Sequence, residues 1–166
     1  MKPAIEFLTY TFAIGLIATA FMDLWALVRK RLFNIPSLDF ALVGRWLGHM
    51  RNGHFIHASI GRAAPVRGEA LIGWMAHYGI GIIFAVVFTS LTGENWRLAP
   101  TIWPAILFGA ATVAAPYFIL QPAMGAGVAA RKTPDPNVAR WRSLVSHLAF
   151  GVGLYFAGLL MRVIMA

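Results

Sequence analysis

Three ionisable residues lie inside long apolar stretches of the sequence, where their chemistry is constrained most. Asp23, His77 and His147 each fall within a stretch of the length that a membrane-spanning helix needs, about 20 residues. A charge in hydrocarbon is costly, so such residues usually have a partner or a function. We expect the three side chains to lie at one depth in the cytoplasmic half. At this depth the three side chains could form a structural hydrogen-bonded cluster, act as a proton or ion relay, or serve as ligands for haem or a metal ion.

The sequence leaves these alternatives open. One Asp–His hydrogen bond satisfies both groups, which favours a structural cluster or a relay over a cofactor. The cofactor alternative rests on His77 and His147, each followed four residues later by glycine, which leaves room for a flat macrocycle or for a neighbouring helix. Haem b requires only the two histidines, whereas a divalent metal also recruits Asp23.

A second group of histidines lies between the first two apolar stretches. His54 and His57 are three residues apart, a spacing that places two imidazoles on one helical face. His49 precedes them, and Glu69 follows some way after. A metal site is one interpretation. A solvated surface that faces lipid headgroups is the other, and it is favoured by the neighbouring arginines and by the lack of an acidic residue close by in sequence.

Four apolar stretches position these residues, at residues 7–28, 70–91, 101–120 and 144–165. Each is long enough to cross a bilayer core of about 30 Å as a helix. Of the 166 residues, 59% are hydrophobic and only 12% are charged, which excludes an ordinary water-soluble domain. The sequence therefore predicts an all-α integral membrane protein, an up-down four-helix bundle that forms one domain over residues 1–166.

Small and polar residues recur every three or four positions in each stretch and predict where the helices pack, because membrane helices associate through such residues. The four stripes are Thr11, Gly15, Thr19 and Asp23; Gly73, His77 and Gly81; Ala105, Gly109, Thr112 and Pro116; and His147, Gly151, Gly158 and Arg162. Glu6 and Arg162 fall at similar depth at the other side of the membrane. The two residues could form an ion pair with each other, or each could be solvated separately, and the sequence leaves both alternatives open.

The basic residues predict the orientation. The net charge is +8, and eleven of the fourteen Lys and Arg residues lie in the loops 29–69 and 121–143. The positive-inside rule places both loops in the cytoplasm and both termini outside. The location of the basic residues therefore explains the net positive charge by membrane topology, not by nucleic-acid binding. With no Cys in the chain, disulfides, thiolate metal sites and Cys nucleophiles are excluded.

Two loops carry local signals. Residues 34–50 predict an amphipathic helix on the inner leaflet, with Asn34 as its cap and Pro36 in its first turn. Pro134, Asp135, Pro136 and Asn137 predict a turn followed by a helix cap that leads into the fourth span. Pro116 predicts a kink in the third span.

The chain resembles a bacterial family of small four-span inner-membrane proteins of unknown function. The resemblance rests on Met22-Asp23-Leu24-Trp25, Gly44-Arg45-Trp46, Gly53-His54-Phe55-x-His57, Gly73-Trp74-x-x-His77-Tyr78, Gln121-Pro122-x-x-Gly125 and His147-Leu148-x-Phe150-Gly151. It implies the architecture and the bacterial inner membrane, and it implies no activity, cofactor or site.

No motif of a familiar soluble enzyme is present, and whether the chain is an enzyme stays open. We expect a non-enzymatic bundle, either a subunit of a membrane complex or a small proton- or ion-linked permease. The alternative is a membrane redox protein or enzyme that binds haem or a metal through His77 and His147. The expected surroundings are lipids, together with further copies of the chain or a membrane-complex partner.

Overall fold

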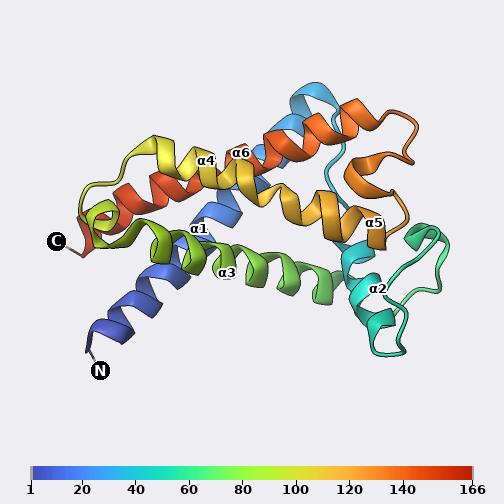
Figure 1. The fold of residues 1–166 in the computed structure, drawn as a ribbon, viewed down its shortest axis with the longest axis horizontal. Coiled ribbons are helices and arrows are strands. Elements are labelled where there is room, and N and C mark those ends of the chain that lie inside the picture. The colour runs from blue at the N-terminus through green and yellow to red at the C-terminus, as the bar shows by residue number, and fades with distance from the viewer. Residues whose placement is uncertain (1, 166) are drawn as a thin grey trace. The chain divides into compact units, whose positions relative to one another are not determined.

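A computed structural model describes residues 2–165 of the chain, with side chains from residue 4 onward, and these residues form helices, turns and loops without a strand (Figure 1). The α-helices are α1 (Lys2–Phe33), α2 (Phe40–Met50), α3 (Glu69–Leu98), α4 (Ile102–Thr112), α5 (Gln121–Ala123) and α6 (Pro136–Ile164). Shorter helical segments are η1 (Ile60–Arg62), η2 (Pro116–Leu120) and η3 (Val128–Ala130).

Four helical segments among the described residues are long and apolar enough to cross a membrane. They are Ala4–Phe33, Glu69–Leu98, Ile102–Ala123 and Pro136–Ile164. The predicted all-α architecture with four spans and an additional helix between the first two is therefore confirmed.

The chain divides into two compact units. Unit 1 comprises Met1–Pro36, Tyr78–Thr112 and Ser146–Ala166, and unit 2 comprises Ser37–His77 and Val113–Val145. Unit 1 contains α1, α4, most of α3 and the second half of α6. Unit 2 contains α2, the first turns of α3 and α6, and the segments between α4 and α6.

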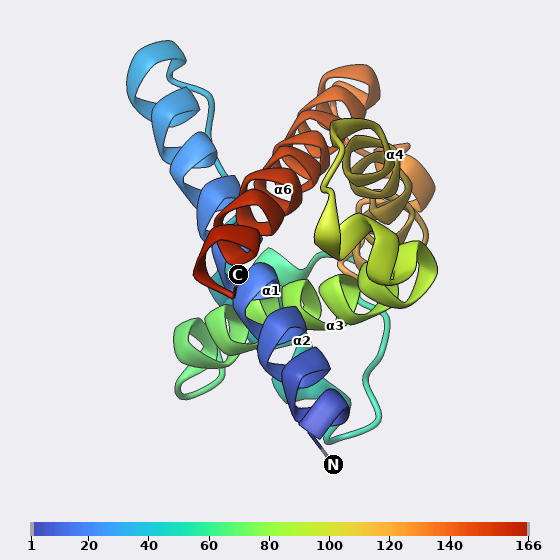
Figure 2. The same ribbon diagram turned by 90° about the vertical axis from the view of Figure 1, so that its left-hand side faces the viewer.

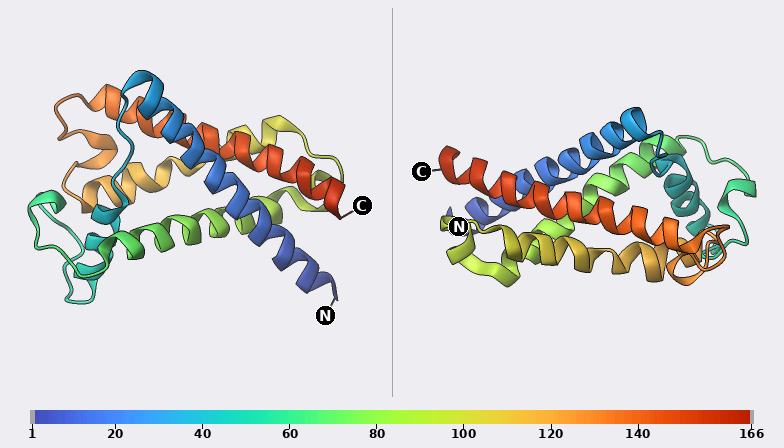
Figure 3. Two further views of the ribbon diagram at one scale, coloured as in Figure 1. Left: turned by 180° about the vertical axis from the view of Figure 1, so that it is seen from behind. Right: turned by 90° about the horizontal axis from the view of Figure 1, so that it is seen from above.

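Unit 1 is a four-helix bundle with an apolar core. Ile14, Phe88, Ala105 and Leu154 come from its four helices and expose at most 1% of their surface. Figures 2 and 3 show α1 and α6 crossing each other obliquely. At this crossing Gly153 of α6 packs on Ala18 and Phe21 of α1.

Glycines allow the helices of unit 1 to approach closely. A Cβ atom at Gly15 would lie 2.7 Å from the Ile82 Cα atom of α3, and one at Gly151 would lie 2.6 Å from the Ala105 carbonyl oxygen of α4. A Cβ atom at Gly153 would lie 2.8 Å from the Ala18 carbonyl oxygen of α1. The predicted packing through Gly15 and Gly151 is confirmed, because neither position has space for a side chain.

Helix α2 crosses the start of α3 in unit 2. Gly44 of α2 packs on the Glu69 carbonyl group, and Gly73 of α3 packs on the Phe40 carbonyl group. Neither backbone leaves room for a Cβ atom. The same crossing stacks the Phe40 ring on the His77 ring, with centroids 4.1 Å apart.

The predicted start of the loop helix at Asn34 is wrong. Asn34 has φ of 52° and follows the end of α1, which reaches Phe33. Helix α2 begins at Phe40, and its cap is Asp39, whose carboxylate accepts a hydrogen bond from the Ala41 N–H at 2.9 Å. The physical reason is that Asn suits both a helix cap and the left-handed conformation that ends helices.

The other helix boundaries also differ from prediction. Helix α3 runs past the predicted end at Leu91 to Leu98, with an interruption at Gly93, whose φ is 68°. Segment η2, which begins at Pro116, is a π-helix, and the predicted kink at Pro116 stays a prediction. The predicted cap of α6 is confirmed and is Asp135, whose carboxylate accepts from the Val138 N–H at 3.1 Å.

Candidate functional site

Three pairs of polar side chains join the four helices of unit 1: Asp23 with Tyr78, Arg29 with Ser146, and Thr112 with His147. We call this set the polar layer; its members are Asp23, Arg29, Tyr78, Thr112, Ser146 and His147. The antiparallel contacts of α1 with α6 define its depth. Gly153 approaches Ala18, and Arg29 bonds to Ser146, so Asp23 and His147 both lie between these two contacts along the crossing.

Helices α4 and α6 are joined by a hydrogen bond of the polar layer. The Thr112 hydroxyl donates to the Gly109 carbonyl at 2.6 Å, and its oxygen lies 2.8 Å from Nδ1 of His147. Because the hydroxyl proton is already used, Nδ1 of His147 must be the donor to Thr112. The neutral imidazole is therefore held as the tautomer that carries its proton on Nδ1.

Two further contacts join α1 to its neighbours. The Tyr78 side chain hydrogen-bonds the Asp23 carboxylate, which links α3 to α1. Arg29 donates from Nη2 to the Ser146 hydroxyl at 2.7 Å, which links α1 to α6.

Arg29 is buried, with 7% of its surface exposed, whereas the adjacent Lys30 and Arg31 are exposed. The sequence placed all three residues alike in the basic cytoplasmic loop 29–69. One signal distinguishes Arg29: it lies eleven residues, three helical turns, after the fully buried Ala18 and therefore on the same face of α1.

Two of the three predicted cluster residues belong to the polar layer. Asp23 and His147 do, while His77 lies in unit 2, stacked on Phe40 and with its ring 5.8 Å from that of Trp74. The predicted meeting of all three residues stays a prediction. Sequence reasoning missed Tyr78 as a site residue. Tyr78 directly follows His77, and its position in the helical period could have identified it.

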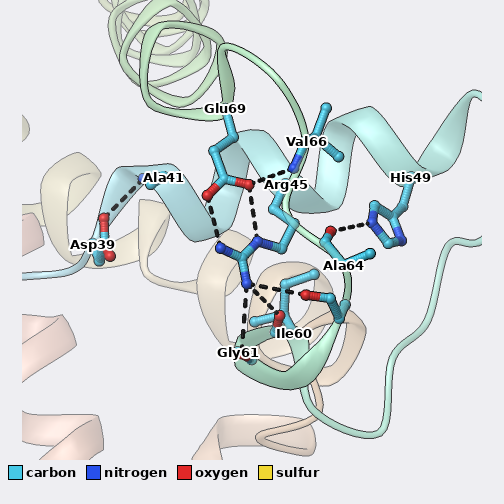
Figure 4. Close-up of polar contacts among 10 residues, drawn as sticks. Asp39, Ala41, Arg45, His49, Ile60, Gly61, Ala64, Val66 and Glu69 are labelled. Carbon is cyan, nitrogen blue, oxygen red and sulfur yellow. Dashed lines mark hydrogen bonds and ion pairs between the residues drawn. The ribbon is translucent and has the colours of Figure 1, made fainter.

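A second polar group, around Arg45, lies in unit 2 (Figure 4). Arg45 and Glu69 form a two-pronged ion pair, with Nε to Oε2 at 2.9 Å and Nη2 to Oε1 at 2.7 Å. The remaining nitrogen, Nη1, donates to the carbonyls of Ala63 at 3.2 Å and Ile60 at 3.4 Å. The Glu69 carboxylate raises the pKa of Arg45. All parts of the guanidinium are engaged, so Arg45 fastens the loop to α2 and α3.

The loop histidines form a short hydrogen-bonded chain. His49 Nε2 donates to the Ala64 carbonyl at 2.9 Å, so His49 Nδ1 accepts from His57 Nε2 at 3.1 Å. The His54 ring lies 6.5 Å from the His49 ring, edge-on. Within residues 2–165, no group of three or more His, Cys, Asp or Glu side chains is arranged to hold a metal ion. The metal interpretation of His54 and His57 therefore gains no support from the geometry.

Glu6 and Arg162 are both exposed on their helices. The ion pair between them stays a prediction.

Comparison with known families covers nearly the whole chain. The model of DUF2938, a family of proteins of unknown function, matches residues 12–161. The chain belongs to this family. The resemblance inferred from sequence motifs, to a membrane family of unknown function, is thereby confirmed. No curated protein and no solved structure matches the chain. Because DUF2938 carries no assigned activity, the function has to be argued from the geometry of the polar layer.

Proposed function

We propose that this chain is a non-enzymatic, proton-linked permease of the bacterial inner membrane, and that Asp23 and His147 take up and release the proton. Support comes from one observation above all. Two titratable side chains on crossing membrane helices are each hydrogen-bonded to a hydroxyl group, Asp23 to Tyr78 and His147 to Thr112. Intramembrane ionisable residues mark proton and ion pathways in many membrane proteins.

Hydroxyl partners suit a group that changes its protonation state. A hydroxyl both donates and accepts, so Tyr78 can donate to an Asp23 carboxylate and accept from an Asp23 carboxylic acid. His147 donates from Nδ1 to Thr112 in both its neutral and its protonated form. Each group can therefore gain or lose a proton without breaking its contact.

Arg29 adds a fixed positive charge to the layer. It lies six residues from Asp23, about 9 Å along the helix axis.

The basic loops support the orientation. Residues 29–69 and 121–143 carry most of the positive charge and belong in the cytoplasm, with both termini outside. Because the chain has no Cys, single-cysteine variants report on topology without background. A membrane-impermeant maleimide added to intact cells should label Glu94→Cys and leave Arg31→Cys unlabelled. The reverse pattern would contradict the orientation.

Proton flux into reconstituted vesicles tests the proposal. Vesicles that contain a trapped pH dye and the wild-type protein should acidify faster than empty vesicles when an acid-outside gradient is applied. Asp23→Asn and His147→Gln should each slow this flux at least about tenfold, the usual scale for a positioned proton-transfer group. Glu94→Gln, which neutralises an exposed carboxylate of α3, is the matched control and should keep the wild-type rate.

Wild-type flux no faster than that of empty vesicles, or undiminished flux in both variants, would overturn the proposal. The first result would favour the role of a subunit in a membrane complex. A chain of 18.2 kDa with four spans encloses little volume, so we also expect the active form to be a homo-oligomer, measurable as a multiple of the chain mass in detergent.

A second candidate is a haem protein that uses His77 and His147. One observation favours it, because ligating histidines commonly hold one ring nitrogen in a hydrogen bond, as His147 does with Thr112. Such a protein would carry electrons through the bound haem. Absorption spectra and metal analysis of the purified protein test this candidate. A haem band or stoichiometric metal that the His77→Ala/His147→Ala double variant loses would favour it over the permease.

A further inference from the structure

The loop at residues 52–59 follows α2, and hydrogen bonds hold it to α2 and to the end of the third span, within unit 2. The Trp46 indole N–H of α2 donates to the Phe55 carbonyl at 2.9 Å, and the His57 N–H donates to the Ala123 carbonyl of α5 at 2.8 Å. The Phe55 side chain is 57% exposed, so apolar burial at this position does little to hold the loop. The loop therefore depends on its polar contacts.

A contact between two histidine rings is one of these. His57 Nε2 lies 3.1 Å from His49 Nδ1, and His49 Nε2 lies 2.9 Å from the Ala64 carbonyl oxygen. We call His49 and His57 the histidine pair. Nδ1 of His57 is buried and has no hydrogen-bond partner among the described residues. The pair therefore offers four ring nitrogens for two hydrogen bonds.

These contacts determine how many protons the pair can carry. The Ala64 carbonyl only accepts, so His49 Nε2 carries one proton. A second proton lies between the two rings, and the neutral pair has no other. As long as the rings stay in contact, a third proton has to reside on Nδ1 of His57, whichever ring carries the positive charge. There it would be a buried donor without an acceptor, which folded proteins avoid.

Further protonation breaks the contact between the rings. With four protons on the pair, both of the nitrogens that face each other are donors, and the two rings carry like charges. An imidazole in water takes up its second proton without either penalty. The released loop therefore binds more protons than the loop that the histidine pair holds.

The charged groups near the pair do not remove this penalty. Glu69 of α3 attracts positive charge on His49, but its carboxylate is already bound by Arg45 of α2 at 2.7 and 2.9 Å. The His54 ring lies edge-on to the His49 ring with centres 6.5 Å apart, too far for a hydrogen bond. Helix α5 contributes no titratable side chain. The other charged residues within 37–77 are exposed: Asp39, Arg51, Arg62 and Arg67.

We propose that the histidine pair is a pH-sensitive latch, and that its protonation releases the loop 52–59 from α2 and α5. The held loop is favoured at neutral pH. It is released as the pH falls through the range from about 7 to 5, where histidine gains its charge, because the released loop binds more protons. This inference goes beyond the proposed function and does not rest on it. With the basic loops in the cytoplasm, the latch responds to acidification of the cytoplasm.

Hydrogen–deuterium exchange of the full chain in detergent tests the latch. The His57 amide reports on it, because this amide donates to the Ala123 carbonyl only while the loop is held. After correction for the intrinsic rate at each pH, it should exchange at least about tenfold faster at about pH 5 than at about pH 7.5, the effect of one proton taken up over one pH unit. The Lys132 amide, which donates to the Ala126 carbonyl at 2.9 Å, is the internal reference and should not change.

Two substitutions separate the held loop from the released one. His57→Gln keeps an amide group that can donate to or accept from His49 Nδ1 and does not titrate, so the loop should stay protected at both pH values. His57→Ala removes the contact between the side chains, so the loop should exchange fast at both pH values. His54→Gln is the matched control, because it removes a histidine of the same loop that lies outside the pair. It should keep the wild-type pH dependence.

Equal protection of the wild-type loop at both pH values would overturn the latch. An unchanged pH dependence in His57→Gln, or its loss in His54→Gln, would also overturn it, because either result assigns the effect to other groups. If His57→Ala does not fold, these two variants still decide the question. Proton flux is not part of this measurement, so failure of the permease would leave the latch intact, and failure of the latch would leave the permease intact.

Discussion

Replacing Gly109 by Ala tests whether close packing of α4 on α6 maintains the polar layer. A Cβ atom at this position would lie 2.6 Å from the His147 carbonyl oxygen and 2.7 Å from the Gly151 Cα atom. Both neighbours belong to the backbone of α6 and cannot rotate away. An ordinary carbon–oxygen contact is about 3.3 Å, so α4 has to move outward by about 0.7 Å.

This displacement is large enough to break the contact between Thr112 and His147. Their present distance of 2.8 Å would grow to about 3.5 Å, which is outside the hydrogen-bond range. Overpacking costs about 1–3 kcal/mol and the lost hydrogen bond about 0.5–1.5 kcal/mol, while Ala favours the helix over Gly by about 1 kcal/mol. We therefore expect the free energy of unfolding to fall by about 1–3 kcal/mol.

Thermal unfolding in detergent measures this effect, and Gly79→Ala is its matched control. Gly79 lies in α3 with nothing within 4 Å of an added Cβ atom, so this variant should be as stable as the wild type or more stable. With about 2–4 °C per kcal/mol for a chain of this size, Gly109→Ala should melt about 2–12 °C lower. It should also lose proton flux in vesicles. Equal melting temperatures for the two variants would refute the packing argument.

Three other predictions follow from the described contacts. Gly44→Ala and Gly73→Ala should force α2 away from α3 and lower the free energy of unfolding by about 1–3 kcal/mol. Gly61→Ala should not, because nothing lies within 4 Å of a Cβ atom at this position. Equal melting curves for the three variants would contradict this. Ser146→Ala removes one hydrogen-bond acceptor of buried Arg29 and should destabilise the chain by about 1–3 kcal/mol in chemical unfolding, in contrast to Ser90→Ala at an exposed position of α3. Arg45→Lys loses the two-pronged ion pair with Glu69 and should release the loop, so that trypsin cleaves at Arg62 about tenfold faster. Mass spectrometry measures the cleavage rate, and an unchanged rate would show that the loop does not depend on Arg45.

The four spans were predictable because hydropathy is a local property of the chain. A long apolar stretch has to form a helix in hydrocarbon, since only a helix satisfies its backbone groups internally. The small-residue positions were predictable for a similar reason. Gly15, Gly109 and Gly151 recur at the helical period, and each proved to lie at a close helix contact.

Local signals failed where one residue type serves two purposes. Asn34 was predicted to begin a helix and instead follows the end of one, because Asn is suited to both conformations. Arg29 was assigned to the basic cytoplasmic loop 29–69 together with Lys30 and Arg31, but α1 continues to Phe33, and Arg29 donates to Ser146 of α6. Charge alone does not reveal which face of a helix a residue occupies.

The spans, their stripes of small residues and the titratable residues inside them can be predicted from the sequence, because these features depend on composition and helical period. The tertiary structure decided the partners: Tyr78 for Asp23, Thr112 for His147 and Ser146 for Arg29. It also brought Arg97 over Tyr10, through the turn at Gly93. Partners depend on how each helix is rotated and how far it slides along its neighbour. Both are set by backbone contacts at glycines between helices far apart in sequence, and no local pattern encodes them.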